Sequence, residues 1–152
     1  MISPERIEQA IRNRFPDAVE ESAEINGVPT LYVEADLISD ICSFLKEDEA
    51  LRFDYLMSLT AVDWPDRFDA VYHLYSIPEK HYVTLKVKLD KNHPSIASIT
   101  GVWKAADWQE REAYDMFGIV FEGHPDLRRI LLEDHWVGFP LRKDYTEGMV
   151  NG

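Results

Sequence analysis

The chain contains few of the residues that build redox or metal centres. Its 152 residues include a single cysteine, Cys42. One cysteine excludes an intramolecular disulfide, a four-cysteine zinc site and an iron–sulfur cluster ligated by cysteines of this chain alone. We interpret Cys42 as a small apolar residue on a helix. If the protein takes part in electron transfer, we expect the electrons to lie on other chains.

Basic residues and long apolar runs are also scarce. The chain has 16 Lys and Arg residues and 28 Asp and Glu residues, which gives a net charge of -12. This charge argues against nucleic-acid binding, which needs a basic face, and weakly against direct binding to anionic lipid. No apolar run approaches the roughly 18 residues of a membrane-spanning helix. The N-terminal MISPERIEQA lacks the basic start and apolar core of a signal peptide, so we expect a cytoplasmic protein.

The motifs of common enzyme sites are missing as well. The stretch 118–127 has two glycines but matches neither glycine-rich phosphate-binding pattern. No G-x-S-x-G or Cys–His–Asn arrangement occurs. No histidine pair has H-x-H or H-x-x-x-H spacing; the five histidines are His73, His81, His93, His124 and His135. Hydrogen-bonding or surface roles explain them more simply than a metal site assembled from distant positions, which remains an alternative.

The first third of the chain predicts a helix followed by a β-hairpin. Ser3-Pro4 is typical of a helix start, with a capping hydroxyl before a proline at the first helical position. Residues 18–25 predict a strand and residues 28–33 its antiparallel partner. Asn26-Gly27 between them is the preferred two-residue hairpin turn. Pro29 favours an edge position for the second strand.

The middle of the chain predicts a second helix and an antiparallel meander. Asp36 is placed to cap a helix with an apolar face up to Leu45. Strands are predicted over residues 53–62, 68–77 and 81–89, joined by short turns without the long crossover that a parallel sheet needs. A helix is then expected over about residues 95–117. The predicted fold class is α+β: an antiparallel sheet with helices packed on one face, followed by an extended C-terminal segment.

Carboxylates cluster on the predicted helix that ends near residue 117. Glu110, Glu112 and Asp115 lie close to Arg111 in sequence. Paired carboxylates can perform acid–base catalysis, but Arg111 and Asp115 are four residues apart and can form an ion pair on one helix face. We favour this structural interpretation. The helix also carries more large aromatic side chains than one apolar stripe needs, which is typical of subunit interfaces.

Residues 126–152 have little periodicity, and a compact domain rarely keeps such a segment unless something holds it. We therefore divide the chain into an α+β domain, 1–125, and an extended partner-binding segment, 126–152, that we expect to be mobile without its partner. The segment contains two basic pairs, Arg128-Arg129 and Arg142-Lys143. Solvated surface is the simple interpretation. Charge-assisted bonds to carboxylates of a partner are the one we favour, because apolar residues flank both pairs.

The sequence from about residue 53 onward resembles the 30 kDa subunit family of respiratory complex I, the proton-translocating NADH:quinone oxidoreductase. The motifs that carry the resemblance are Glu110-Arg111-Glu112, Tyr114-Asp115-Met116-Phe117-Gly118, Gly123-His124-Pro125-Asp126-Leu127, Arg128-Arg129-Ile130-Leu131 and Pro140-Leu141-Arg142-Lys143-Asp144-Tyr145. Leu59 to Asp63 and Tyr72-His73-Leu74 also resemble family positions. The chain departs from the family pattern at Glu133, Phe139 and Thr146.

The resemblance implies a non-catalytic subunit of the peripheral arm, on the cytoplasmic side of the plasma membrane. Such a subunit scaffolds the large 49 kDa-type subunit, which helps to form the quinone site, and it holds no cofactor or metal. NADH, FMN, iron–sulfur clusters and quinone belong to the complex as a whole. An obligate interface of this kind buries on the order of 2,000 Å² or more.

The partner-interface residues implied by the family motif are Glu110, Arg111, Glu112, Asp115, Phe117, Gly118, His124, Pro125, Arg128, Arg129, Arg142, Lys143, Asp144 and Tyr145. We predict that replacing the four basic residues of the C-terminal segment by alanine weakens assembly and leaves the isolated fold intact. Two alternatives remain open. One is the equivalent subunit of a complex I-related membrane-bound hydrogenase or plastid-type complex, and the other is a stand-alone enzyme that uses His and Asp with a metal.

Overall fold

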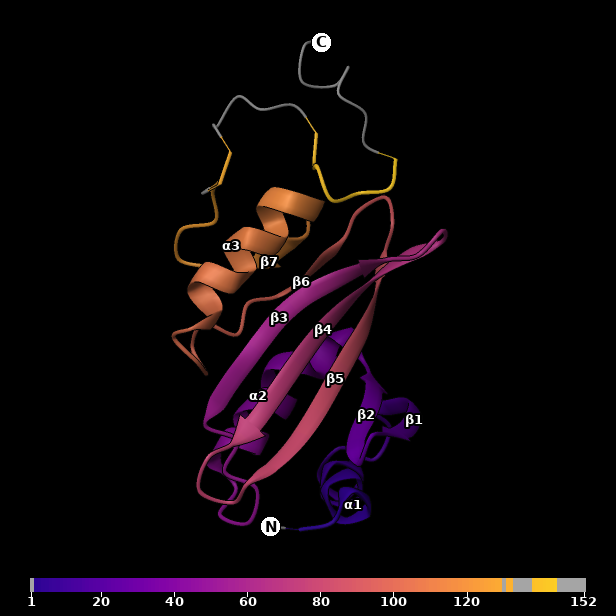
Figure 1. Ribbon diagram of the computed structural model, residues 1–152, viewed down its shortest axis with the longest axis vertical. Coiled ribbons are helices and arrows are strands. Elements are labelled where there is room, and N and C mark those ends of the chain that lie inside the picture. The colour runs from indigo at the N-terminus through magenta and orange to yellow at the C-terminus, as the bar shows by residue number, and fades with distance from the viewer. Residues whose placement is uncertain (1, 130, 133–137, 145–152) are drawn as a thin grey trace.

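The computed structural model describes residues 2–129, 131–132 and 138–144. Three α-helices, one short 3₁₀ helix and seven strands follow one another along the described chain (Figure 1). In chain order they are α1 (Pro4–Arg14), β1 (Val19–Ile25), β2 (Val28–Val33), η1 (Ala35–Leu37), α2 (Ile38–Glu47), β3 (Tyr55–Asp63), β4 (Arg67–Ser76), β5 (His81–Asp90), β6 (Ser95–Ala97), α3 (Ala106–Phe117) and β7 (Val120–Glu122).

Five strands form one mixed sheet in the order β1-β2-β5-β4-β3. The predicted hairpin and meander are present, and the α+β class is confirmed. One pairing differs from the antiparallel expectation, because β2 and β5 run parallel where Thr30 pairs with Thr84 and Tyr32 with Lys86. Short turns fix the direction of neighbouring strands, whereas the path through α2 decides how the hairpin meets the meander.

Pro29 lies on an internal strand, contrary to the expected edge position. Its strand β2 has β1 on one side and β5 on the other. The structure tolerates the proline because the parallel register with β5 begins one residue later, at Thr30. The missing N–H of Pro29 therefore interrupts no bond of that ladder.

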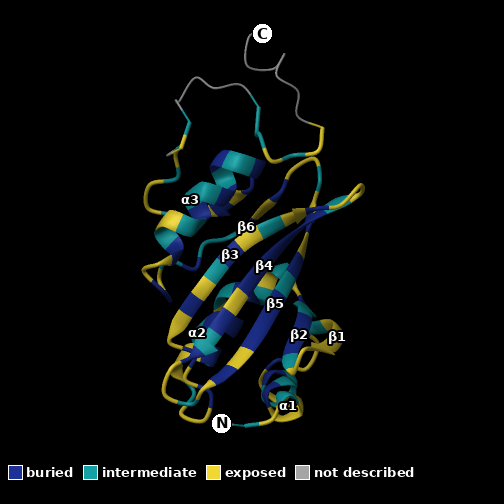
Figure 2. Cartoon of the chain, viewed as in Figure 1, coloured by how far each residue is buried: buried dark blue, intermediate teal, exposed yellow. Residues whose placement is uncertain are grey.

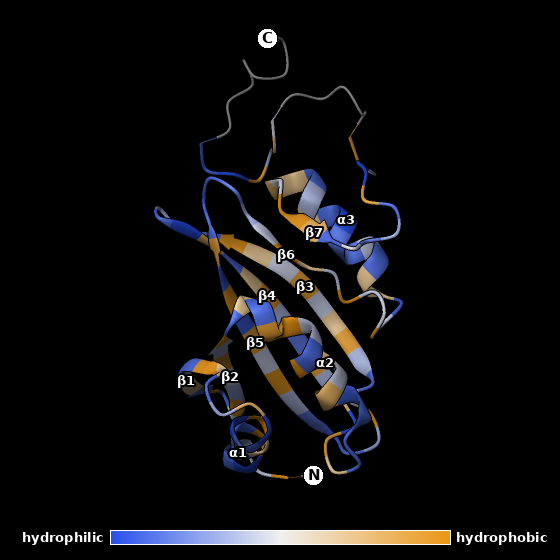
Figure 3. Cartoon of the chain, turned by 180° about the vertical axis from the view of Figure 1, so that it is seen from behind, coloured by the Kyte–Doolittle hydropathy of each residue, from blue (hydrophilic) through white to orange (hydrophobic). Residues whose placement is uncertain are grey.

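Helices α1 and α2 cover one face of the sheet, and the opposite face is open (Figures 2 and 3). The Ser3 hydroxyl caps α1 by accepting from the Arg6 amide (3.3 Å), as the sequence predicts. Asp36, in contrast, does not cap α2. It lies within η1, and α2 begins after Leu37 without a side-chain cap. The core between helices and sheet includes the fully buried side chains Ile7, Ile11, Ile41, Leu45, Phe68 and Tyr72.

The helix expected over residues 95–117 is shorter than predicted. Residues Ser95–Ala97 form β6, which pairs in parallel with β7, and the helix α3 begins at Ala106. The partner strand Val120–Glu122 follows α3 in the chain, so local helical propensity gives no sign of this pairing.

Helix α3 lies beside β3, which is the edge strand of the five-stranded sheet. The Gln109 amide spans the edge, accepting from the Leu59 backbone N–H and donating to the Leu56 carbonyl. These bonds satisfy backbone groups that would otherwise be open to pairing with another chain. They also fix the family motif on α3 beside the sheet.

Candidate partner interface

Two carboxylates of the family motif point into the protein from α3. Glu110 and Asp115 are both fully buried. The Glu110 carboxylate accepts from the Ser98 hydroxyl (2.7 Å) and from the Ile99 amide (2.8 Å). Burial raises the pKa of Glu110, and these two hydrogen bonds partly offset the rise. Glu110 thus anchors the loop between β6 and α3.

Asp115 holds the start of the C-terminal segment. Its carboxylate accepts from the backbone N–H groups of Leu131 (2.7 Å) and Leu132 (3.1 Å), and from Arg129 Nη1 (3.0 Å). Arg129 also donates through Nη2 to the Gly138 carbonyl (2.7 Å). The expected pair between Asp115 and Arg111 is replaced by the pair with Arg129, because the segment returns over α3.

Arg111 is left with a different environment. Its guanidinium lies 5.8 Å from the centroid of the Trp108 ring. Within the described ranges, its buried Nε has no hydrogen-bond partner. Trp108 donates to Glu112 (3.0 Å), so this carboxylate is also bound within α3. Glu112 and Trp108 are exposed enough to contact a partner.

Gly118 allows the later part of the segment to approach α3. It ends the helix with φ +80°, and a Cβ there would lie 2.7 Å from the Phe139 ring and 2.9 Å from Arg142 Nη2. Arg142 donates to the Phe117 carbonyl (2.6 Å), and the Leu141 amide donates to the Met116 carbonyl (3.0 Å). Burial lowers the pKa of Arg142. The close packing therefore depends on the absence of a side chain at position 118.

A second carboxylate of the α+β domain, that of Asp63, binds the C-terminal segment near the end of its described part. Asp63 lies at the end of β3, is buried, and forms an ion pair with Lys91. Its Oδ2 atom accepts from the Lys143 backbone N–H (2.7 Å). In the sequence, Asp63 has only a turn position and a place in the family motif. Neither reveals this bond, because it joins residues 80 positions apart.

His124 has a structural role in the turn before the segment. Its Nε2 lies 3.1 Å from both the Asp107 carbonyl and the Asp107 carboxylate, and its Nδ1 accepts from the Asp126 amide (2.9 Å). Nε2 therefore carries the ring proton and donates to Asp107. Pro125 beside it is exposed.

The four basic residues divide into two structural classes. Arg129 and Arg142 bind groups of α3, namely the Asp115 carboxylate and the Phe117 carbonyl. The Arg129 side chain is only 8% exposed. Arg128 is 65% exposed and pairs with the similarly exposed Asp126 (3.1 Å). Lys143 and Asp144 are exposed, and Tyr145 lies outside the described residues. Alanine at 129 or 142 would thus disturb the fold itself, which revises the expectation for those two residues.

Apolar side chains of the segment remain exposed beside these anchors. Leu131 is 54% and Leu141 56% exposed. Both line a groove of about 250 Å³ between the segment, β3 and α3, together with Met116 and Phe117. Exposed leucines beside an apolar groove are typical of a surface that binds another protein. The sequence motif contains both leucines but gives no sign that they are exposed.

The described residues contain no cluster of three or more His, Cys, Asp or Glu side chains that could hold a metal ion. Two further histidines have hydrogen-bond partners: His81 Nε2 lies 2.7 Å from the Leu51 carbonyl, and His73 Nδ1 lies 3.1 Å from the Thr84 hydroxyl. Among the helices of the described residues, none is long and apolar enough to span a membrane.

The exposed leucines beside the apolar groove are typical of a protein that binds other proteins. Residues 31–149 match the family described as respiratory-chain NADH dehydrogenase, 30 Kd subunit. The chain belongs to this family.

Relatives and solved structures agree with this assignment. The chain is 45% identical to the C subunit of the NADH-quinone oxidoreductase of Roseiflexus sp. (strain RS-1), over 92% of this chain and 82% of the relative. It is 47% identical to the corresponding protein of Moorella thermoacetica, over 92% and 95%. A trypsin-resistant fragment (1-134) of Nqo5 has a similar fold, with TM-score 0.67, 27% identity and coverage of 81% and 98%. A chain of a membrane-bound sulfane sulfur reductase, described as an archaeal respiratory membrane complex, gives TM-score 0.73, 27% identity and coverage of 94% and 85%.

Proposed function

We propose that this chain is the non-catalytic peripheral-arm subunit of a proton-translocating NADH:quinone oxidoreductase. In this role it scaffolds the large 49 kDa-type subunit on the cytoplasmic side of the plasma membrane. NADH, FMN, iron–sulfur clusters and quinone would be bound by other subunits. Family membership and the names of the relatives support this assignment. The observation that carries the scaffolding role is the pair of exposed leucines beside the apolar groove on the anchored segment.

The proposed interface combines the segment 126–152 with the outer surface of α3. Leu131 and Leu141 supply apolar contacts, and Arg128 and Lys143 supply exposed charges. Asp115, Gly118, Arg129 and Arg142 act indirectly, because they hold the segment in place. An interface of this kind has an apolar centre and a charged rim.

Co-purification with the large subunit tests this proposal. Leu131→Glu combined with Leu141→Glu should reduce recovery of the large subunit at least about tenfold, since each apolar anchor contributes about 1–2 kcal/mol. Ile77→Glu is the matched control, because Ile77 is similarly exposed and lies in the turn after β4. Recovery equal to that of the unaltered chain would contradict the proposed interface, provided that both variants melt near the same temperature.

A second candidate comes from the likeness to the sulfane sulfur reductase complex. The chain could be the equivalent subunit of a complex I-related complex with another electron donor, such as a membrane-bound hydrogenase or a plastid-type complex. Mass spectrometry of the co-purified subunits separates the two. An NADH-binding flavoprotein among them supports the first candidate, and a hydrogenase or sulfur-reducing subunit in its place supports the second.

A further inference from the structure

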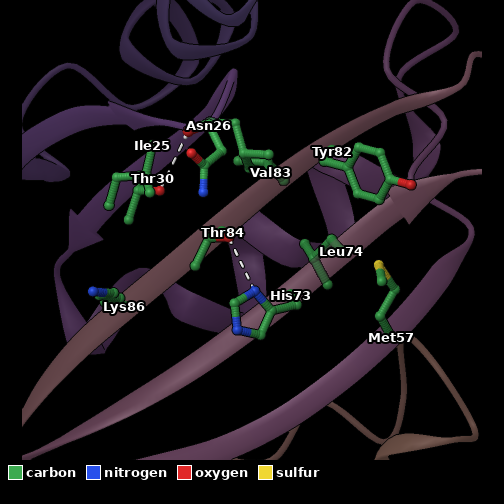
Figure 4. A pocket seen from close by; sticks show the side chains of 11 residues that line it. Ile25, Asn26, Thr30, Met57, His73, Leu74, Tyr82, Val83, Thr84 and Lys86 are labelled. Carbon is green, nitrogen blue, oxygen red and sulfur yellow. Dashed lines mark hydrogen bonds between the residues drawn. The ribbon is translucent and has the colours of Figure 1, made fainter.

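A second groove lies on the open face of the five-stranded sheet. It has a volume of about 290 Å³ and extends from the β1–β2 turn across β5 and β4 to Met57 of β3 (Figure 4). Its existence follows from the pairing of β2, since the parallel register with β5 covers only Thr30 to Tyr32. Before Thr30, the hairpin turn is free of β5, and the space between them is open.

One end of the groove is apolar. Met57 and Tyr82 line it (Figure 4), and both are among the exposed large apolar side chains of the protein. The Tyr82 ring packs on Tyr75 of the neighbouring strand with centroids 4.4 Å apart. Beyond the groove, Tyr55 continues the exposed apolar surface. Contiguous apolar surface of this kind is a sign of a binding partner.

The other end of the groove is basic. Lys86 and His73 lie on either side of Thr84 there (Figure 4). When the Thr84 hydroxyl donates to Nδ1 of His73 (3.1 Å), Nε2 carries the ring proton and can donate to a ligand. Burial and the nearby Lys86 charge both lower the pKa of His73.

Lys86 differs from the other cations of this face. Lys88 lies 3.6 Å from the Glu21 carboxylate, and Arg67 lies 2.9 Å from that of Asp69. Across the part of the chain that the structure describes, Lys86 forms no ion pair and lies 5.6 Å from the centroid of the Tyr32 ring. The Lys86 ammonium group is therefore available to a carboxylate of another chain.

We propose that this groove docks a segment of another polypeptide that presents one large apolar side chain and one carboxylate. The apolar side chain fills the end formed by Met57 and Tyr82, and the carboxylate binds Lys86 and His73 Nε2. Tyr82 and Lys86 are four residues apart on β5, which is about 13 Å in a strand. An extended segment therefore spans the groove with an apolar residue and an acidic residue four positions apart, both on the same side.

A second copy of this chain does not supply the carboxylate through the same face. Asp69 is buried and accepts from Tyr32, Trp64 and Arg67. Glu21 is paired with Lys88. In a symmetric pairing of two open faces, these carboxylates would already be occupied by their own cations. The acidic group therefore comes from a different chain.

Photo-crosslinking in the intact complex tests the inference. A benzophenone amino acid at position 57, introduced by Met57→benzoylphenylalanine, should crosslink to a segment of another subunit that contains an Asp or Glu. Lys86→Glu in the same chain should lower the yield at least tenfold. Lys104→Glu is the matched control, because Lys104 is exposed and lies outside the groove.

Three outcomes overturn the inference: no crosslink to another polypeptide, a crosslink to a second copy of this chain, or equal yields with Lys86→Glu and Lys104→Glu. Melting of the isolated variants shows that a lost crosslink is not a lost fold. The inference rests on the proposed place of the chain in a complex, but it concerns another surface. Co-purification without the crosslink contradicts only the groove, whereas a chain that purifies alone contradicts both proposals.

Discussion

Glu110 is a buried acid whose protonation affects stability. Its pKa is raised from the ordinary 4.5 because burial disfavours the charged form. Because the folded-state pKa is raised, the protonated Glu110 carboxyl group stabilises the fold relative to the unfolded chain. This contribution is fully present below pH 4.5 and is lost as the pH rises through the folded-state pKa. The hydrogen bonds from Ser98 and Ile99 reduce this loss without removing it.

We expect Glu110→Gln to remove this pH dependence. The amide keeps the shape and can still accept from Ile99, but it cannot ionise. Relative to the variant, the unaltered chain should lose stability as the pH rises from about 4 to about 7. Urea unfolding of both chains across this range measures the difference. A constant difference in the free energy of unfolding would contradict the assignment of a raised pKa to Glu110.

Gly118→Ala should destabilise the packing of the C-terminal segment. Alanine at position 118 would have to adopt a left-handed backbone conformation with φ +80°, which is unfavourable for a residue with a side chain. Its Cβ would also lie 2.7 Å from the Phe139 ring. Together these effects should lower the free energy of unfolding by about 2 kcal/mol. Thermal or urea unfolding measures the loss. Gly101→Ala is the control, because no atom lies within 4 Å of its Cβ position; an equal loss there would count against the steric explanation.

Helix α3 anchors the C-terminal segment, whose described residues form neither helix nor strand. Asp115 near the end of α3 and Asp63 at the end of β3 bind backbone N–H groups of this segment. Each buried carboxylate also faces a cation, Arg129 or Lys91. The cations compensate the burial of charge, which would otherwise be unfavourable.

Asp115→Asn should release residues 129–132 and leave the sheet intact. The variant keeps the size of the side chain but loses the charge that faces Arg129, so the free energy of unfolding should fall by about 3 kcal/mol. Amide hydrogen exchange at Leu131 and Leu132 should accelerate at least tenfold, while amides of β4 and β5 change little. Asp66→Asn is the control, since Asp66 is exposed. Unchanged exchange at Leu131 would show that Asp115 does not hold the segment.

The sequence predicts most elements but not the contacts between distant ones. Alternation along residues 82–89 and the Asn26-Gly27 turn are local signals, and β5 and the hairpin appear where expected. The strand Ser95–Ala97 falls in a stretch predicted as helix, because its partner β7 lies beyond α3. The parallel pairing of β2 with β5 likewise depends on the path of the whole chain.

For the proposed interface, the sequence predicts the segment but not the structural position of each residue. The family motif marks both Arg128 and Arg129 without distinguishing them, yet one is exposed and the other is bound to Asp115. Which arginine lies inside depends on the path of the segment over α3. The anchoring role of Asp63 is hidden from the sequence for the same reason.

At the scale of the whole molecule, limited proteolysis should report how the segment is anchored. Trypsin needs an accessible Lys or Arg on a chain that can open locally. We expect the first cleavages in the segment after Arg128 and Lys143, which are exposed, and later ones after Arg129 and Arg142, which bind groups of α3. Intact-mass spectrometry over a time course identifies the sites. Initial cleavage after Arg129 would contradict the described anchoring.

The boundary between the proposed domain, 1–125, and segment, 126–152, does not coincide with a loss of contacts. Residues 127–132 and 138–144 include groups bound by both Asp115 and Asp63. The segment therefore contributes to the stability of the domain as well as to the proposed interface. Loss of the segment would affect both, so truncation alone cannot separate assembly from folding.

Asp63 recognises the main chain of the segment, and Asp115 recognises both the main chain and the Arg129 side chain. Each accepts from peptide N–H groups, which any residue except proline provides. A chimera that carries the tail of another member of the family should therefore follow the same route over α3, provided that it keeps an arginine opposite Asp115. The outward side chains of the graft could then be chosen freely, which makes this attachment a means of exchanging partner specificity without redesigning the fold.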